Sequence, residues 1–231
     1  MDENPRASPH IWQPDWLVLR QLARALRALL ADPALRLPGA RVLDFGCGSR
    51  PYESWFAAAG ALYRGADIDG EHEVRIHADG TLDCGDAECD LVTSFQVLEH
   101  VWDVATYLRE ARRVLRPEGW LLLSTHGTWL YHPHPYDYRR WTAEGLRREV
   151  EAHGFRLKRM EPVVGPLAWT TVFRSLGLVH FLKRLPLLGG PLSGLAAMAF
   201  NARAWLEERV TPREITANNA CTYVGLFRRE G

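Results

Sequence analysis

An acidic residue followed by two glycines, Asp44-x-Gly46-x-Gly48, is the segment whose residue types and spacing best suit ligand binding. The short apolar run before it is typical of a buried strand, and the segment from Tyr52 to Ala59 is predicted to be helical. Because glycine tolerates positive φ and has no Cβ, the chain can turn sharply here and let a ligand approach its backbone. A ligand at this corner would meet free N–H groups and the positive end of a helix dipole.

Two cofactor classes bind at such a corner, and this sequence favours one of them. A dinucleotide-binding fingerprint requires a third glycine where this chain has Pro51, and the Asp44 carboxylate would repel a pyrophosphate. The pattern Asp44-x-Gly46-x-Gly48 instead resembles motif I of the class I S-adenosylmethionine (SAM) methyltransferases. In that family the glycines lie against the methionine end of the cofactor, and the acidic residue helps to hold its amino group.

Further motifs follow in the order typical of that family. The segment Gln96-Val97-Leu98-Glu99-His100-Val101 is similar to the family's VLEHV signature. The segment from Arg113 to Gly119 is similar to RVLKPGG, with Glu118 in place of a glycine. Together with the strand end at Gly65-Ala66-Asp67, these motifs identify the chain as a member of the class I methyltransferases, in the broad "methyltransferase type 11" group.

The resemblance implies a SAM site and assigns its residues. Asp67 follows the glycine loop by roughly twenty residues, where it would bind the ribose hydroxyls, and Asp69 is the alternative by register. Asp79 would accept a hydrogen bond from the adenine amino group, the alternative being an acid in a surface turn. The implied cofactor-binding residues are Asp44, Gly46, Cys47, Gly48, Asp67, Ile68, Asp79, Phe95 and Gln96.

Two histidines are candidates for the catalytic base. A hydroxyl acceptor must lose its proton during methyl transfer, and histidine is the natural base near neutral pH. His100 is the first candidate, because it is predicted to start the helix after the fourth strand and to face the methyl group. The alternative is a histidine that only hydrogen-bonds locally at the helix start. His126 is the second candidate, and His132 is a further one.

The stretch from His126 to Thr142 is predicted to contact the acceptor. It follows the fifth strand, so it should lie at the carboxyl edge of the sheet, where ligands bind in this class of fold. Similar HP…DYxRxT loops occur in methyltransferase-like proteins that resemble those of surface-polysaccharide pathways. We therefore expect a hydroxyl of a small-molecule or saccharide/glycolipid acceptor, although these rings could instead stack as a lid. The expected substrate contacts are His132, Tyr136, Asp137, Arg139 and Trp141.

Neither a metal nor nucleic acid is expected. His132, His134 and Asp137 are close in sequence, but alternating histidine and proline sets no recognised ligand spacing. Quinone O-methyltransferases with a similar segment have E-x-x-E-H, which binds a divalent metal, whereas this chain has Gln96 at the first position. The net charge is zero, so no basic field indicates nucleic acid. The segment Ser94-Phe95-Gln96-Val97 also lacks the N/D-P-P-Y motif of base- and amide-methylating families.

The elements that position these residues indicate one α/β domain over 1–231, because 231 residues, 47% of them hydrophobic, suffice for one sizeable core. We expect a Rossmann-like, doubly wound sheet of about seven strands, the last of them antiparallel, with an N-terminal helix and a helical insertion. The predicted parts are an N-terminal cap helix (1–38), a cofactor-binding core with the substrate loop (39–160), an apolar helical insertion (161–210) and the final strand (211–231). After the first strand, which ends at the glycine corner, the predicted strands cover 61–69, 74–77, 89–95, 120–125, 156–160 and 221–227.

The predicted helices have recognisable ends. The N-terminal helix spans Trp16 to Ala31 and either caps the cofactor cleft, as it often does in the family, or packs on the sheet edge, which we favour. Pro117 and Gly119 are predicted to end the helix that carries the RVLKPGG-like segment. Thr142 is predicted to cap a helix that runs to His153.

The insertion is the least conventional part of the chain. A membrane-spanning helix needs about twenty consecutive apolar residues, and the uncharged run from Leu185 to Phe200 is broken by prolines and glycines. We favour a helical hairpin that covers the cleft or forms a homodimer seam. The alternative is an interfacial element within 163–205, with cations such as Arg174 and Lys183 beside an apolar surface that makes peripheral membrane contact.

Composition completes the expectations. The four cysteines form no metal spacing and no disulfide framework, and the polar N-terminus does not resemble a signal peptide. We expect a cytoplasmic protein, with peripheral association at the inner face of the membrane as the second option. The leading function is SAM-dependent methyl transfer. The alternative is a non-catalytic SAM-binding partner protein in a biosynthetic complex, and Pro51 argues against the third class, an NAD-type oxidoreductase.

Overall fold

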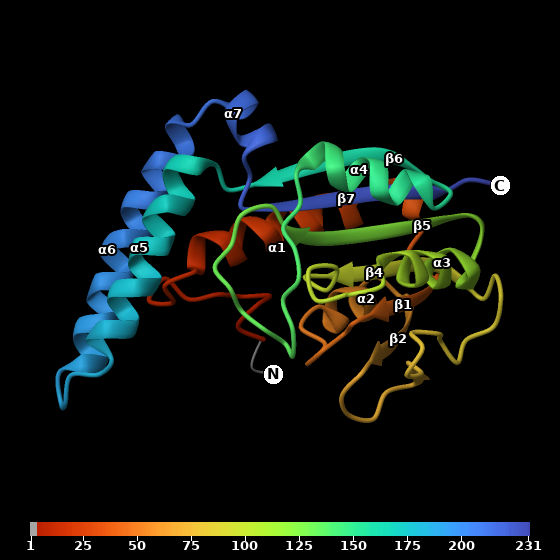
Figure 1. The fold of residues 1–231 in the computed structure, drawn as a ribbon, viewed down its shortest axis with the longest axis horizontal. Coiled ribbons are helices and arrows are strands. Elements are labelled where there is room, and N and C mark those ends of the chain that lie inside the picture. Colours follow the sequence, from red (N-terminus) through yellow and green to blue (C-terminus); the bar gives the residue numbers. More distant parts are fainter. Residues whose placement is uncertain (1–3) are drawn as a thin grey trace.

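A seven-stranded mixed sheet forms the centre of the molecule in a computed structural model that describes residues 4–231 (Figure 1). The strand order is β3-β2-β1-β4-β5-β7-β6, and β7 runs antiparallel to both of its neighbours while the other paired strands are parallel. This confirms the predicted Rossmann-like sheet with an antiparallel last strand. The strands are β1 (Arg41–Phe45), β2 (Leu62–Asp67), β3 (Val74–Arg75), β4 (Cys89–Phe95), β5 (Leu115–His126), β6 (Phe155–Val163) and β7 (Thr222–Arg229).

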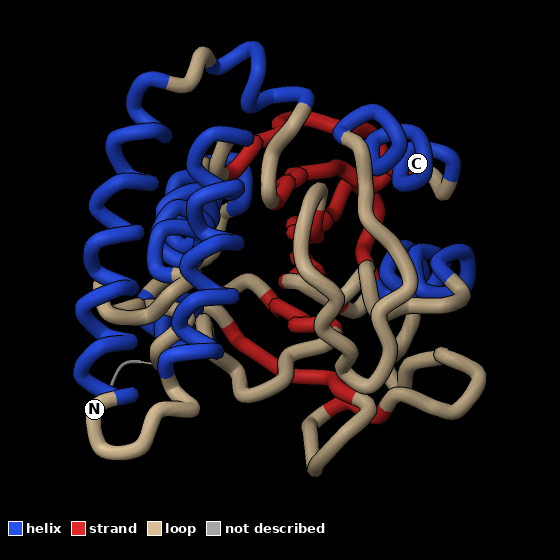
Figure 2. The backbone as a smooth tube through the Cα atoms, turned by 60° about the vertical axis from the view of Figure 1, so that its left-hand side comes forward, coloured by secondary structure: helices blue, strands red, loops and turns tan. Residues whose placement is uncertain are grey.

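Helices cover both faces of the sheet, as Figure 2 shows from the side. Successive residues of a strand point to opposite faces, so Val42 and Leu43 of β1 belong to two separate apolar clusters. One cluster packs against α1 and α2, and the other packs against α3 and α4. The helices are α1 (Trp16–Leu30), α2 (Glu53–Ala58), α3 (Val104–Val114), α4 (Ala143–Ala152), α5 (Pro166–Leu182), α6 (Gly189–Val210) and α7 (Arg213–Asn218).

Two predicted helix boundaries can be compared with the structure. Thr142 caps α4 as predicted, because its Oγ1 accepts a hydrogen bond from the Gly145 N–H at 3.0 Å. The prediction that Pro117 and Gly119 end the preceding helix is wrong. The helix α3 stops at Val114, and Leu115 is already extended and pairs with Cys89 of β4. A residue before proline is disfavoured in helical conformation, so this segment joins the strand instead.

The N-terminal helix packs on the sheet. Six buried residues of α1, among them Leu22 and Leu26, belong to the apolar cluster that also contains Val224 of β7. This agrees with the simpler of the two sequence interpretations. No residue of α1 lines the cavity described below, and among residues 4–15 only Arg6 does, so the cap expected within 1–38 stays a prediction.

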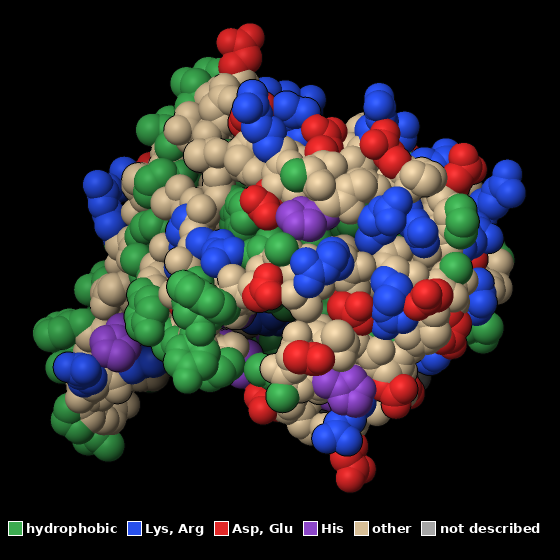
Figure 3. Space-filling view, turned by 45° about the vertical axis from the view of Figure 1, so that its right-hand side comes forward, with side chains coloured by type: hydrophobic (Ala, Val, Ile, Leu, Met, Phe, Trp, Pro, Cys, Tyr) green, Lys and Arg blue, Asp and Glu red, His purple; other side chains and the backbone are tan. Residues whose placement is uncertain are grey.

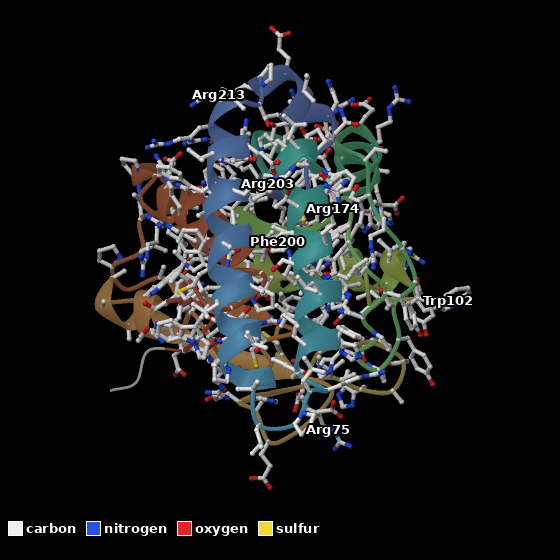
Figure 4. All side chains as sticks on the ribbon, turned by 90° about the vertical axis from the view of Figure 1, so that its left-hand side faces the viewer. Arg75, Trp102, Arg174, Phe200, Arg203 and Arg213 are labelled. Carbon is white, nitrogen blue, oxygen red and sulfur yellow. The ribbon has the colours of Figure 1, made fainter. Side chains whose placement is uncertain are left out.

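The insertion is a helical hairpin, as the sequence favoured, but no residue of α5 or α6 lines the cavity described below, so the hairpin does not cover it, and the homodimer seam stays a prediction. The helices α5 and α6 stand side by side at one edge of the molecule (Figures 1 and 4), and small side chains of α6 spaced four residues apart, such as Ser193 and Ala197, are buried along its length. The amide of Asn201 on α6 donates to the carbonyls of Ile11 and Gln13, which ties the hairpin to the N-terminal segment. Neither these two helices nor any other within residues 4–231 meets the length and apolarity that crossing a membrane requires.

Candidate functional site

A cavity of about 840 Å³ lies at the carboxyl ends of β1, β2 and β4. Its walls come from the loops that follow these strands, from Arg6, and from the segment His132 to Pro135. In an α/β sheet this edge is where ligands bind, because the loops after neighbouring parallel strands converge there. All nine residues that the sequence assigned to the cofactor line this cavity.

The glycine corner is a tight turn that only glycine fits at its first position. Gly46 has a φ of 87°, and a Cβ placed there would lie 2.5 Å from Cγ2 of Val97. The free N–H groups that the sequence predicted at this corner are engaged within the protein. Gly46 and Cys47 donate to the Ala66 carbonyl at 2.8 and 3.1 Å, and Gly48 donates to Oδ2 of Asp67 at 2.7 Å. The six-residue helix α2 begins only at Glu53, too far along the chain to present its N-terminus at the glycines.

Asp44 is a buried carboxylate at the end of β1 that lines the cavity. Its two oxygens accept hydrogen bonds from the Tyr63 hydroxyl at 2.6 Å and the Thr93 hydroxyl at 2.9 Å. Burial raises the pKa of Asp44 to about 6, which the two hydroxyls only partly offset. A carboxylate held this way favours a cationic group beside it, because a positive charge restores the stabilisation that burial removes.

Asp67 is the last residue of β2, and Asp79 lies in the loop that follows β3. Oδ1 of Asp67 accepts from the Ile68 N–H at 2.7 Å, so both of its oxygens are oriented by backbone amides. Asp69, the alternative by register, does not line the cavity. Asp79 lines the cavity and also forms a turn, since its Oδ1 accepts from Thr81 N and Thr81 Oγ1 at 3.0 and 2.7 Å. The hydrogen bonds from Thr81 hold the pKa of Asp79 below its usual value.

A group of histidines closes the cavity on the side of β5. The sequence predicted that His100 starts a helix, and this is wrong. His100 lies in a turn, and α3 begins only at Val104, after the capping residue Asp103. Nδ1 of His100 lies 2.5 Å from the Tyr136 carbonyl oxygen, so it donates there and leaves Nε2 with its lone pair. The rings of His100 and His132 are 4.9 Å apart, and both line the cavity.

His126 is placed behind this group and not at the cavity. It is buried, its ring stacks on Trp129 at 5.2 Å, and its Nδ1 lies 2.6 Å from Oε1 of Glu99. The structure therefore does not support His126 as a base that touches substrate. Its place in the fold is to hold Glu99, whose other oxygen accepts from the Thr125 hydroxyl at 2.8 Å.

Of the five predicted substrate contacts, only His132 lines the cavity. Asp137 pairs with Arg140 at 2.5 Å and accepts from the His132 backbone N–H at 3.0 Å, so it shapes the loop from within. The guanidinium of Arg140 holds the pKa of Asp137 well below its usual range.

The other three predicted contacts also face elsewhere. Arg139 donates to the Trp102 carbonyl at 3.0 Å and lies over the Trp141 ring at 5.9 Å, while the Tyr136 side chain is exposed. Tyr136, Asp137, Arg139 and Trp141 therefore do not line the cavity, and their contact with a substrate stays a prediction.

Several cavity residues were missed from the sequence. Tyr107 stacks on Phe45 at 3.9 Å and donates its hydroxyl to the Phe45 carbonyl at 2.8 Å, which fixes one wall. Arg6 brings a cation to the cavity from the N-terminal segment, and Trp102 brings a mostly exposed indole. Trp102 directly follows the VLEHV-like segment, so its position was a usable signal, whereas Arg6 carries no local signal at all.

One group of side chains has the geometry of a metal site. Glu99, His100 and His132 offer ligand atoms that all lie within 4.8 Å of one another. The sequence did not predict this group, because His132 comes from a loop distant in the chain. Gln96, which stands in place of a quinone-methyltransferase acid, donates its amide to the Ser124 hydroxyl at 3.1 Å. Oε1 of Glu99 faces Nδ1 of His126, so one of the three candidate ligands is already engaged.

Comparison with known proteins identifies the class. Residues 18–159 match the family model described as a methyltransferase domain. A "probable S-adenosylmethionine-dependent methyltransferase" from Mycolicibacterium smegmatis is 31% identical over 142 residues, which cover 54% of this chain and 55% of that protein. A ubiquinone biosynthesis O-methyltransferase from Thiobacillus denitrificans is 30% identical over 116 residues, covering 43% of this chain and 50% of that protein. The chain thus spans about half the length of the curated relatives it matches.

A solved structure shows the same fold. The S-adenosylmethionine-dependent methyltransferase from Mesorhizobium loti superposes with a TM-score of 0.54 at 18% identity, covering 90% of this chain and 98% of that one. The sheet order, the acid–glycine corner and the cavity define a class I, Rossmann-like methyltransferase fold. Because the family model covers more than half of the chain, this protein belongs to the SAM-dependent methyltransferase family.

Proposed function

We propose that this protein binds SAM in the cavity and transfers its methyl group to a hydroxyl of a small-molecule or saccharide/glycolipid acceptor. The observation that carries the proposal is the convergence of Asp44, Asp67 and Asp79 on one cavity that also contains His100 and His132. Three carboxylates from three crossovers suit a ligand with a cationic end, a diol and an amino group. Two imidazoles that line the same cavity suit an acceptor that must lose a proton.

The residues present fit the cofactor. The buried Asp44 carboxylate, held by two hydroxyls, would pair with the ammonium group of the methionine end. Asp67, oriented by Gly48 and Ile68, would accept hydrogen bonds from the ribose hydroxyls, and Asp79 would accept from the adenine amino group. SAM supplies a methyl group already activated by its sulfonium, so the protein mainly aligns the acceptor and excludes water.

His100 is the proposed base. Because its Nδ1 donates to the Tyr136 carbonyl, the lone pair of Nε2 remains available to a ligand in the cavity. The acceptor oxygen forms a bond to the methyl carbon as the carbon–sulfur bond breaks, and the acceptor proton moves to Nε2 of His100. His132 stays largely neutral, since burial and the neighbouring histidines His126 and His100 lower its pKa, so it suits hydrogen bonding to an uncharged acceptor.

A hydroxyl acceptor is also favoured by the character of the loop. The segment His132-Pro133-His134-Pro135 alternates imidazoles with rigid apolar rings along one wall of the cavity. This pattern suits a saccharide, whose hydroxyls and apolar ring faces alternate. The name of the Thiobacillus denitrificans relative is consistent with an oxygen acceptor, although that protein matches only part of this chain.

Calorimetry and methyl-transfer assays test the proposal. We expect Asp67→Ala to weaken SAM binding at least tenfold, whereas Asp69→Ala, a neighbouring acid outside the cavity, should leave the affinity unchanged. Removal of a general base costs about 10²- to 10⁴-fold in rate. His100→Ala should therefore lower kcat by this factor at unchanged SAM affinity, while His134→Ala should change mainly KM. SAM binding without transfer to any member of a broad hydroxyl panel would instead support the non-catalytic partner protein.

A further inference from the structure

The turn between α5 and α6 carries an exposed apolar surface, which we call the tip patch. Leu187 is 98% exposed, Leu188 is 63% exposed and Phe181 is 62% exposed. The remaining members, Leu185, Leu192 and Leu195, are between 40% and 60% exposed. Figure 3 shows hydrophobic side chains gathered on the projecting end of the hairpin, away from the body of the molecule.

The side chains of the tip patch do not contribute to the buried core of the hairpin. The buried residues of the hairpin are small or on its inner face, such as Ala168, Ser175 and Ala197, and the tip leucines are not among them. Leu187 also has a φ of 63°, a left-handed conformation that favours glycine or asparagine in a turn. An exposed leucine at such a position stabilises the fold neither by burial nor by its backbone conformation. Its side chain therefore suits contact with another molecule.

The charge of the hairpin is one-sided towards its tip, because its two acids, Glu207 and Glu208, lie near the far end of α6. From Pro162 to Leu206 the sequence contains no aspartate or glutamate, although the whole chain has as many acids as bases. The same segment contains four cations, Arg174, Lys183, Arg184 and Arg203, of which Arg203 pairs with Glu207 at 2.7 Å. Two of them directly follow α5 at the tip, and Arg184 lies 3.1 Å from His180. Asp15, the residue before α1, is an acid from another element that acts on Lys183, and it is partly buried.

We propose that the tip patch docks this protein on the surface of an anionic membrane. Leucines and a phenylalanine beside lysine and arginine are the composition of an interfacial element, whose apolar side chains enter the headgroup boundary while its cations meet anionic lipid. The hairpin lies on such a surface and does not cross it.

A second copy of the chain is a poorer occupant for the tip patch. A two-fold interface places the same patch on both sides, so Lys183 and Arg184 of one tip would face those of the other, and the segment from Pro162 to Leu206 offers no acid to pair with them. Anionic lipid headgroups supply the missing negative charge. Charge complementarity therefore selects a membrane over self-association.

The N-terminal segment connects the tip patch to the cavity. Trp12, which is 56% exposed, lies next to Gly194 of α6, and tryptophan is enriched at membrane–water interfaces. The same segment is held to α6 by Asn201 and carries Arg6 into the cavity wall. Docking would thus bring the cavity close to the membrane surface and favour an acceptor carried by a lipid. The docking itself does not depend on methyl transfer, so its test is separate from that of the proposed function.

Flotation of the full chain with vesicles tests this proposal. We expect the protein to float with vesicles of phosphatidylcholine containing 30% phosphatidylglycerol and to remain behind with phosphatidylcholine alone. In the double variant Leu187→Ser/Leu188→Ser, the fraction of protein bound to vesicles should fall at least tenfold. The variant Lys183→Gln/Arg184→Gln should lose the part of the binding that high salt removes from the wild type. The matched control Leu206→Ser/Val210→Ser removes two exposed apolar residues from the other end of α6 and should bind as the wild type does.

Two further measurements make the result decisive. Circular dichroism and the SAM affinity should be unchanged in the tip variants, because the tip patch lies outside the cavity. Wild-type protein that fails to float with anionic vesicles at low salt would overturn the proposal, as would equal flotation of the Leu187→Ser/Leu188→Ser variant. A wild-type dimer that becomes monomeric in this variant, without any vesicle binding, would assign the tip patch to a second copy instead.

Discussion

Nδ1 of His126 lies 2.6 Å from Oε1 of Glu99, and both side chains are buried behind the histidines of the cavity wall. Burial acts to raise the pKa of Glu99, but the hydrogen bond and charge of His126 outweigh it, so the pKa lies below its usual value. The pair fixes the loop after β4, which carries His100, to the end of β5. It is therefore a structural support of the site.

Glu99→Gln should destabilise the fold substantially. Removing one member of a buried pair leaves the other without compensation and costs about 3 to 5 kcal/mol. Urea unfolding measures this loss. The matched control is Glu118→Gln, which removes an exposed acid paired with Arg228 at 2.7 Å and should cost less than about 1 kcal/mol. Equal destabilisation by the two variants would contradict the structural role of the Glu99–His126 pair.

Gly46→Ala should disrupt the SAM site more than a comparable glycine substitution elsewhere. Its new Cβ would lie 2.5 Å from Val97, whereas Gly39, with a similar positive φ of 74°, has no atom within 4 Å of the same position. Both substitutions carry backbone strain of about 1 to 2 kcal/mol, but only the first also displaces the cavity wall. We expect SAM binding, measured by calorimetry, to fall more than tenfold in Gly46→Ala and to persist in Gly39→Ala. Similar affinities in both variants would contradict this account.

The buried Asp44 carboxyl should make SAM binding depend on pH. Because its pKa is about 6 in the folded protein, the group is largely protonated below that pH and cannot pair with an ammonium group. SAM affinity should therefore rise as the pH increases through about 6. Calorimetry at pH 5 and pH 7.5 measures the change, and Asp44→Asn should remove it while weakening binding at the higher pH. A wild-type affinity that does not change across this range would refute the assignment of Asp44.

The Asp44 carboxyl should also make the stability of the fold depend on pH. Its contribution should decrease as the pH rises, whereas that of an acid paired on the surface increases. Its folded pKa of about 6 exceeds the ordinary value of 3.8, so between these values the unfolded chain loses its proton first. The contribution of Asp44 to stability is thus largest below about pH 4 and decreases as the pH rises to about 6. Chemical unfolding should measure the free energy of unfolding of the wild type and of Asp44→Asn from about pH 4 to about pH 6. As the pH rises, the wild type should lose stability relative to the variant. A constant difference would contradict the raised pKa.

Methyl transfer should survive removal of divalent metal. Glu99, His100 and His132 have a suitable spacing, but Glu99 is engaged by His126, and Nδ1 of His100 by the Tyr136 carbonyl. With His100 as base, dialysis against a chelator should leave kcat within twofold. Loss of activity that one particular divalent cation restores would instead assign these three side chains to a metal.

The sequence predicted that the residues assigned to the cofactor lie together, and they line one cavity, because their positions follow from local patterns. The acid–glycine corner and the strand ends each show a short-range signature, and the carboxyl ends of parallel strands must meet at one edge. The predicted strand 89–95 coincides with β4 for this reason. The hairpin was likewise readable, since apolar runs broken by proline and glycine suit two helices and a turn.

The sequence did not predict which side chains of the loop after β5 turn towards the cavity. Asp137 looked like a substrate contact in the sequence, yet it pairs with Arg140, three residues away, and holds the His132 backbone. Tyr136 contributes a carbonyl to His100 and turns its ring outward. Which side chains a proline-rich loop turns inward depends on partners such as Glu99 and Trp102, and no local pattern encodes them.

The position of β7 constrains how the chain can be assembled during synthesis. β6 reaches the sheet only through β7, which inserts between it and β5. While the ribosome is still making the hairpin, the outer edge of β5 therefore has no strand partner, and β6 has no strand to pair with. The nascent protein can complete its sheet only after residues 222–229 have emerged, and until then the outer edge of β5 has unpaired backbone groups that another strand could bind.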